Sequence, residues 1–277
     1  MRRAYTSNQR PMATAPLNRP EIGSIHLTLL DVGQGLSVVL ETRHHILVYD
    51  TGAKFSAHSD MGQSVVLPFL QGKGYSHIDT LIISHGDNDH IGGAVSLLNE
   101  MTTDRLLTSV PRQLSHYAPI KCHAGQSWLW DEVIFTMLSP DRVFTSDNDN
   151  SCVLKIESKH GVILLTGDIE ATAENWLVKT YANALNADIV VAPHHGSKTS
   201  SSSGFLQATD AKYFLISAGY KNPFGHPHQN VLIRYRQNQV RWLNTADSGA
   251  IEVKFSNHTW SVHGIRETES KYWNRRD

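Results

Sequence analysis

Three apolar segments of the sequence each end in histidine or aspartate. DTLII (79–83) is followed by SHGDNDH (84–90), GVILLTG (161–167) is followed by Asp168, and DIVVAP (188–193) is followed by His194 and His195. Short apolar runs bounded by turn residues are typical of buried strands. Clefts for chemistry open at the carboxyl ends of strands in layered α/β folds, so the repetition predicts such a fold, with polar residues from three strand ends gathered at one cleft.

The rest of the chain follows the same alternation of strands and helices. Before residue 101 we expect a strand at 25–30, a hairpin of 36–42 with 44–50, helices at 64–74 and from 90 to 100, and the strand at 79–84. Later we expect strands at 133–138, 152–157, 161–166, 188–193, 211–217, 240–244, 250–256 and 258–263 and helices after 168, at 205–210 and after 228.

The composition shows no break inside 23–265, which predicts a single domain over that range. Residues 1–22 are polar and dotted with proline, without the apolar stretch of a signal peptide, and are interpreted as a linker or an added tail; 266–277 is interpreted as a C-terminal tail. No apolar run approaches the roughly 18 residues that a spanning helix needs, so we expect no membrane insertion by this chain.

The charge balance limits the surfaces that the chain can present. With 25 Lys and Arg against 26 Asp and Glu, the net charge is −1, which argues against a broad nucleic-acid-binding face. Cys122 and Cys152 form no metal motif. They fit either one disulfide or two free buried thiols.

The densest group of chemistry-bearing residues is SHGDNDH, with His85, Asp87, Asp89 and His90 inside six positions. Imidazole nitrogen and carboxylate oxygen both suit divalent transition metals. The alternative is a polar loop that caps a helix, with Asp89 as the N-cap. Asp168 alone could be a turn residue and the two later histidines surface residues, but three strand ends with the same chemistry favour a metal site.

These motifs resemble the metallo-β-lactamase superfamily: the pattern HxxxDH, then an aspartate and a histidine at later strand ends, with Asp50 in VYDTG as the early aspartate. DVGQG (31–35), PHHGS (193–197) and GHPH (225–228) narrow the resemblance to the hydrolase domain of the ComEC family of DNA-uptake competence proteins, from residue 25 to about 264. The resemblance implies a four-layer αββα sandwich in the α/β class, with two divalent metal ions between the sheets.

The resemblance also implies roles for single residues. His85 and Asp87 would hold one metal, Asp89, His90 and His194 the second, and Asp168 both. In much of the superfamily the position of Asp87 is a histidine, as is one position before the Asp168 strand, where Asn150 and Asp149 are the nearest candidates here. Exchanging nitrogen for oxygen ligands hardens the first site, so we expect Mn²⁺ to be favoured over Zn²⁺. DVGQG is expected to form a close-packed loop beneath the metals, either as a purely structural tight turn or as a substrate contact.

The implied activity is DNA phosphodiester hydrolysis by a metal-activated water, which Asp89 would orient. His195 and His226 would contact the phosphate or protonate the leaving group, and SKTSSSSG (197–204) is expected to be a mobile solvated loop. The chain would be an excised part of an inner-membrane protein, facing the periplasm or cell exterior beside its channel portion. There it would degrade the non-transferred strand in natural transformation. The alternatives are another phosphoesterase on the same fold and a non-catalytic DNA-guiding domain.

Overall fold

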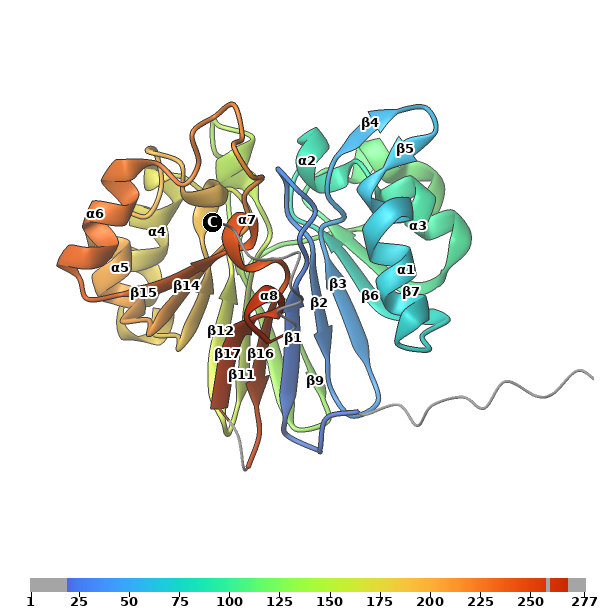
Figure 1. Ribbon diagram of the computed structural model, residues 1–277, viewed down its shortest axis with the longest axis horizontal. Helices are drawn as coiled ribbons and strands as arrows, with labels where there is room; N and C mark the ends of the chain where they lie inside the picture. The colour runs from blue at the N-terminus through green and yellow to red at the C-terminus, as the bar shows by residue number, and fades with distance from the viewer. Residues whose placement is uncertain (1–18, 258–259, 269–277) are drawn as a thin grey trace, which may run out of the picture.

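The computed structural model describes residues 19–257 and 260–268, and it has two large β-sheets packed face to face (Figure 1). Helices α1 and α3 cover the outer face of the first sheet, and α4, α5 and α6 cover the second. Most of the predicted tails, residues 1–18 and 269–277, lie outside the described residues, as do residues 258 and 259 of the last predicted strand. Helix α8 extends to residue 268, past the domain boundary predicted at 265.

The first sheet contains, in spatial order, β17 (Trp260–Gly264), β16 (Ile251–Phe255), β1 (Ile25–Leu29), β2 (Val38–Glu41), β3 (Ile46–Tyr49), β6 (His77–Ile83), β7 (Thr102–Thr108) and β8 (Ile120–Lys121). The second contains β15 (Arg241–Asn244), β14 (Tyr213–Ile216), β13 (Ile189–Val191), β12 (Gly161–Leu165), β11 (Val153–Ser158), β10 (Val133–Ser139) and β9 (Ser127–Trp130). A small hairpin pairs β4 (Lys54–Ser56) with β5 (Ser59–Asp60).

The helices connect these strands. They are α1 (Leu67–Gly72), α2 (Asn88–Ile91), α3 (Ala94–Glu100), α4 (Ala171–Tyr181), α5 (Ser203–Thr209), α6 (Gln229–Gln237), α7 (Thr245–Ser248) and α8 (Ile265–Thr268). A π-helical turn, η1 (Gly62–Val66), leads into α1, and short 3₁₀ turns are η2 (Pro111–Tyr117), η3 (Asn148–Asn150), η4 (Ala182–Leu185) and η5 (Pro193–Gly196).

The strands of the hairpin β2–β3 show why the sheets stack in layers. Val38 and Leu40 contact the core between the two sheets, whereas Val39 between them faces the core under α1 and α3. Successive strand side chains point to opposite faces, so a strand that is apolar throughout requires packing on both sides. The second sheet has the same organisation beneath α4, α5 and α6. The order of layers is therefore helix, sheet, sheet, helix, and the predicted αββα sandwich is confirmed.

Two local features differ from the expectations: one strand was not predicted, and one stretch was predicted wrongly. Strand β7 was not predicted because TTDRLLT has polar residues in its first half and lacks a continuous apolar run. The serine-rich stretch after His195 is not a mobile solvated loop, since Ser197, Ser200 and Ser201 are buried. Buried backbone there needs partners, and the Glu174 carboxylate accepts the N–H groups of Ser201 and Ser202. The stretch is a packed wall behind η5.

Cys122 and Cys152 form a disulfide that joins the two sheets, which decides between the two interpretations of these residues. Cys122 follows β8 in the first sheet and Cys152 precedes β11 in the second, and both are fully buried. The backbone carbonyl of Cys152 accepts a hydrogen bond from the Tyr49 hydroxyl at 2.6 Å, and its N–H donates to the Ser84 carbonyl at 3.0 Å. The disulfide therefore lies next to the segment that carries His85.

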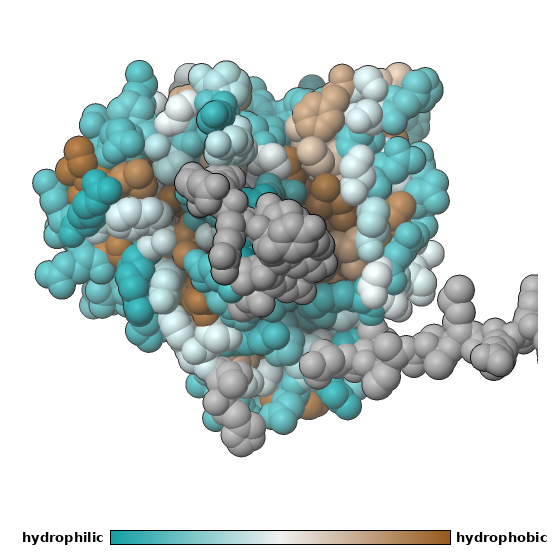
Figure 2. All heavy atoms as spheres, viewed as in Figure 1, coloured by the Kyte–Doolittle hydropathy of each residue, from teal (hydrophilic) through white to brown (hydrophobic). Residues whose placement is uncertain are grey.

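The surface in the same view is mostly hydrophilic, with hydrophobic residues scattered between polar ones (Figure 2). Its upper edge is notched between the two halves, on the side where α2 follows the carboxyl end of β6. Among the described residues, no helix combines the length and the apolar character that crossing a bilayer requires.

Candidate metal centre

The segment after β6 supplies four polar side chains at the edge of the first sheet. His85 follows the strand after one residue, Asp87 is the N-cap of α2, and Asp89 and His90 lie in its single turn. Gly92 and Gly93 separate α2 from α3, so the helix predicted from residue 90 to 100 is two short helices. The short α2 is close-packed beneath DVGQG, because a Cβ on Gly35 would lie 2.5 Å from the Asp89 carbonyl. That loop therefore packs closely against the segment that carries Asp89, as expected.

Asp50 holds this segment in place from the end of β3. Its carboxylate is fully buried and accepts hydrogen bonds from the Ser84 backbone N–H and the Ser84 hydroxyl, both at 2.7 Å. His90 Nδ1 lies 2.8 Å from the same carboxylate. Asp50 has a φ of +59°, a backbone conformation that aspartate tolerates better than most residues. Asp50 thus orients His90 and does not itself face the cluster.

The second sheet contributes Asp168 and the two adjacent histidines. Asp168 follows β12 after two residues, is nearly fully buried, and its N–H donates to the Ser151 hydroxyl at 3.1 Å. His194 and His195 lie in η5, directly after β13, and both have positive φ angles, +46° and +53°. Non-glycine residues with this backbone conformation cluster at functional sites.

The structure places these two histidines at different distances from the carboxylates of the cluster. His195 is buried, and its Nε2 lies 3.2 Å from an Asp89 oxygen and 3.4 Å from an Asp168 oxygen. His194 is more exposed, and its Nε2 is 3.8 Å from Asp168. The prediction that His194 completes the second site and His195 contacts substrate is therefore not what the geometry favours. The turn of η5 directs the second histidine, not the first, into the cluster.

The four histidines share one arrangement of hydrogen bonds. His195 Nδ1 lies 2.8 Å from the Ser217 carbonyl oxygen, which can only accept, so Nδ1 carries the proton. His90 Nδ1 faces Asp50, and His194 Nδ1 faces Glu170 at 3.1 Å. The Ser84 hydroxyl donates to Asp50 and so accepts from His85 Nδ1 at 3.0 Å. Each neutral ring is therefore left with its Nε2 lone pair, the arrangement that metal-binding histidines adopt.

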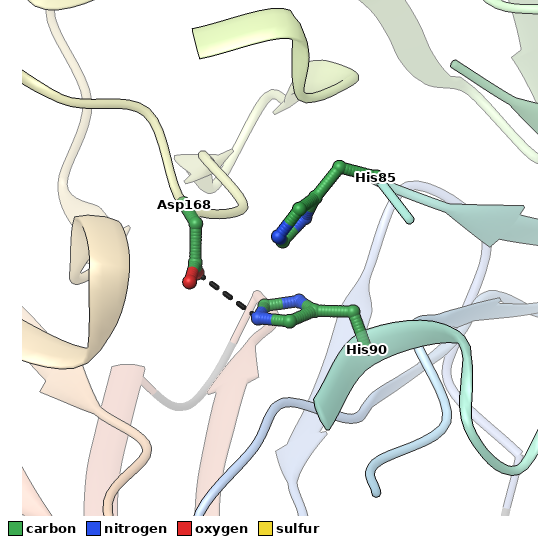
Figure 3. Close-up of side chains that lie close together, drawn as sticks. All are labelled: His85, His90 and Asp168. Carbon is green, nitrogen blue, oxygen red and sulfur yellow. Dashed lines mark ion pairs between the residues drawn. The ribbon is translucent and has the colours of Figure 1, made fainter. Parts of the chain in front are cut away.

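These atoms meet in a small volume between the sheets. His90 Nε2 lies 3.1 Å from Asp168 Oδ1 and 3.2 Å from His195 Nε2. His85, His90 and Asp168 point toward one another from the two halves of the molecule (Figure 3). Asp89, His90 and His195 form a second group that shares His90 with the first. Two overlapping groups are what a two-metal centre requires.

The electrostatics of the cluster favour added positive charge. Burial lowers the pKa of His90, but Asp168 and Asp50 outweigh it and raise that pKa well above its ordinary value. For His195 burial is likewise outweighed, mainly by Asp168, which raises the pKa to about 9. Burial alone would raise the pKa of Asp89, but His195 and His90 lower that pKa to about 2. The carboxylates that hold protons on these rings would hold metal cations in their place.

Two buried atoms of the cluster have no hydrogen-bond partner: His85 Nε2 and Asp168 Oδ1. His90 Nε2 is near the second of these atoms but outside hydrogen-bonding geometry. A buried polar atom without a partner costs about 1–3 kcal/mol of stability. Such atoms are therefore retained where a bound ion or water satisfies them. Both atoms are of the kinds that bind divalent metals. The residues present therefore fit a metal centre made of His85, Asp89, His90, Asp168 and His195.

The remaining predicted ligands have different surroundings. Asp87 reaches His85 Nε2 at 3.5 Å with its side chain 54% exposed, so it borders the cluster. Asn150 was predicted as a first-site ligand, and this is wrong in the structure, because its amide donates to the carbonyls of Phe144 and Ser146 and accepts from the Phe144 N–H. Asp149 accepts from the Glu170 N–H at the start of α4. Neither side chain is available to the cluster.

His226 lies beside the centre without joining it. Its ring stacks at 6.3 Å on His195 and 5.7 Å on Phe224, and its Nδ1 is buried without a partner. The side chain of Asn222 fixes its backbone, accepting from the His226 N–H at 2.9 Å and donating to its carbonyl. Burial, then the neighbouring histidines, lowers the pKa of His226 to about 4, so the ring is neutral at pH 7.

The sequence did not reveal the groups that hydrogen-bond to the histidines of the cluster. Ser84 and Glu170 were not singled out, although each lies within two residues of a predicted ligand. The Ser217 carbonyl carries no sequence signal, because any residue supplies one. Positions next to strand-end ligands are where such partners could have been sought.

Replacing Asp50 with asparagine is expected to weaken metal binding about 10–100-fold, the usual cost of losing the outer partner of a ligand histidine. Asparagine tolerates the positive φ, but its NH₂ group would face either the Ser84 donors or His90 Nδ1. Competition against a chromogenic chelator measures the affinity. Asp60→Asn is the control, since Asp60 is also buried but accepts from Gln63 and Ser96 away from the cluster. Equal affinities for both variants would refute the role of Asp50.

The fold and the cluster together define a candidate metal-dependent hydrolase of the αββα class. A family model described as the metallo-beta-lactamase superfamily matches residues 30–102, which include His85, Asp89 and His90. The chain is similar in fold to the metallo-beta-lactamase fold protein YhfI from Bacillus subtilis, with a TM-score of 0.57 at 12% identity, covering 83% of this chain and 99% of that one. The chain belongs to the metallo-β-lactamase superfamily.

Relatives with higher identity carry more specific names. Over 89% of its length the chain is 35% identical to Recombination protein 2 of Haemophilus influenzae, and over 82% it is 36% identical to Competence protein ComA of Neisseria gonorrhoeae. The matched regions are 31% and 32% of those proteins. The chain thus spans about a third of the length of these curated relatives.

Proposed function

We propose that this chain is a metal-dependent nuclease that hydrolyses phosphodiester bonds of DNA and degrades the non-transferred strand during natural transformation. The observation that supports it most directly is the convergence of three histidine Nε2 atoms with the carboxylates of Asp89 and Asp168 between the sheets. The similarity to a competence protein and a recombination protein supports DNA as the substrate.

His85, His90 and His195 with Asp89 and Asp168 would hold two divalent ions, and Asp87 would complete the first site. When bound, the metals supply a hydroxide-like water and neutralise charge on the phosphate. Three carboxylates among these residues favour Mn²⁺ more than an all-histidine set would. The preference for Mn²⁺ is therefore inferred from the donor atoms. Zn²⁺ is the ion with which Mn²⁺ is compared in the digestion experiment below.

The chain's own residues have distinct tasks. The pKa of Asp89, about 2, keeps its carboxylate ionised, so it serves as an acceptor that orients the attacking water and not as an acid. His226 is neutral at pH 7 and can donate one ring N–H to a substrate oxygen. Protonation of the leaving group by a charged His226 is disfavoured by that same low pKa. The neutral hydrogen bond is the role we assign to it.

The cellular setting is part of the same proposal. We place the domain at the periplasmic or extracytoplasmic face, beside the membrane-channel portion of a longer protein. The buried disulfide supports an oxidising compartment. The fraction of the relatives that the chain spans leaves room in such proteins for further domains.

Digestion of end-labelled single- and double-stranded DNA tests the activity. We expect cleavage with Mn²⁺, weaker cleavage with Mg²⁺ or Zn²⁺, and none with a chelator, because the carboxylate-rich site requires a hard divalent ion. Metal content is measured on the same samples. Intact DNA after incubation with protein that has bound Mn²⁺ would refute the nuclease and favour a DNA-guiding domain.

A further inference from the structure

A pocket of about 490 Å³ opens beside Gly86 and Asp87, within the range of ligand-binding pockets. Its other walls come from the end of β7, from η2, from β8 and from η3, so it lies at the side of the metal centre where the first sheet ends. None of its other lining residues belongs to the cluster described above. The pocket is therefore a neighbouring space and not the metal site itself.

Arg112 and Lys121 place two cations on this pocket. Both residues are exposed, and within residues 19–257 and 260–268 neither has a carboxylate at ion-pair distance. Some basic residues of the chain are paired, as Lys73 is with Glu41 and Lys212 with Asp188. Unpaired cations that line one pocket favour an anionic ligand.

Two carboxylates also line the pocket, and they make its charge uneven. Asp87 borders the cluster, with a carboxylate oxygen 3.5 Å from His85 Nε2. Asp147 faces the pocket from the start of η3. An anion is therefore held best on the wall formed by η2 and β8, where the cations lie. A chain with regularly spaced phosphates can place one there and its neighbour at the metal centre.

The cationic wall is fixed to the segment that carries the metal ligands. Lys121 precedes Cys122, whose disulfide reaches Cys152, and the Ser109 hydroxyl donates to the Ser84 carbonyl at 2.8 Å. Gln113 lies across Gly86, since a Cβ at residue 86 would come within 2.4 Å of its Nε2. A wall held this firmly needs little ordering when a ligand binds.

We propose that Arg112 and Lys121 form a phosphate subsite that holds the nucleic-acid backbone next to the phosphodiester at the metal centre. The subsite rests on the proposed nuclease function, and it adds the residues that position the strand. Contacts of this kind are independent of base sequence and depend on salt.

The double variant Arg112→Gln with Lys121→Gln tests the subsite through binding of a fluorescein-labelled 15-mer of thymidine, followed by anisotropy in chelator so that the strand stays intact. We expect Kd to rise about tenfold. The slope of log K against log salt should fall by about 1.4, since each lost single-strand phosphate contact removes about 0.7. Lys179→Gln on α4 removes one charge from the outer helix layer and should bind as the wild type does. Unchanged Kd and slope in the double variant would overturn the subsite.

Cleavage provides the second measurement. With Mn²⁺, the double variant should lose at least about five times more activity on the 15-mer than on bis(p-nitrophenyl) phosphate, which has no neighbouring phosphate for the subsite. Equal losses on both would mean that the substitutions damage the metal centre, which also overturns the proposal. Failure of the wild type to cleave either substrate would refute the nuclease function, while the binding measurement would still decide the subsite.

Discussion

Asp168→Asn is expected to abolish cleavage of DNA with Mn²⁺, with a loss of about a thousandfold or more, well beyond the 10–100-fold cost of an outer partner. Asp168 provides two carboxylate oxygens to the centre, one 3.1 Å from His90 Nε2 and the other 3.4 Å from His195 Nε2. An amide retains one oxygen and replaces the other with a donor that repels a cation. The cleavage rate and the bound metal are measured together, and both should fall.

The matched control is Asp104→Asn. His77, Asp79 and Asp104 form a third group that could hold a cation, but it is partly exposed. His77 begins β6, whereas His85 follows the opposite end of that strand. This substitution removes the same charge and should leave cleavage within about twofold of the wild type. Loss of cleavage in Asp104→Asn with normal cleavage in Asp168→Asn would mean that the centre has been assigned to the wrong group.

Removing the disulfide is expected to cost about 2–4 kcal/mol of unfolding free energy, because the bridge closes a loop with a sequence separation of 30 residues. For a chain of this size the melting temperature should fall by roughly 5–15 °C. The change is the double variant Cys122→Ala with Cys152→Ala, and thermal unfolding followed by circular dichroism measures it. Metal affinity should fall as well, because the bridge holds residues 151 and 152 in place. The Cys152 N–H donates to the Ser84 carbonyl, and the Ser151 hydroxyl accepts from the Asp168 N–H.

Reduction of the wild type provides the control for this result. A reductant should lower the melting temperature of the wild type toward that of the double variant and should leave the variant itself unchanged. If the reductant lowers the melting temperature of both proteins equally, reduction of the disulfide is not the cause of the change. If neither the reductant nor the substitutions shift the transition, the disulfide does not stabilise the fold.

Much of the architecture could be predicted because the strands are apolar on both faces. Runs such as SVVLE and DTLII have few ways to bury both sides other than inside a layered sandwich. Strand β7 escaped prediction because parallel pairing with β6, not its own sequence, makes Thr102–Thr108 a strand. The serine stretch after η5 was misjudged for a related reason. Its burial depends on a carboxylate in α4 and on Arg234 in α6, both remote in sequence.

The candidate site was predictable in position but not in detail. Strand ends locate His85, Asp89, His90 and Asp168, because the residues after a strand must lie at the sheet edge. They do not say which of two adjacent histidines turns inward. That choice depends on the positive φ angles of η5 and on the Ser217 carbonyl that accepts from His195. Asn150 shows the same limit, since its amide is used by the turn from Phe144 to Ser146.

The centre draws its side chains from both sheets, with His85 and His90 from one and Asp168 and His195 from the other. An unfolded chain cannot present this set, so a bound cation favours the docked state of the sandwich over every separated one. At a free concentration a hundred times the dissociation constant, such a ligand adds about 2.7 kcal/mol to the stability. The metal supply of the compartment would then govern how long the domain persists there, in addition to how fast it works.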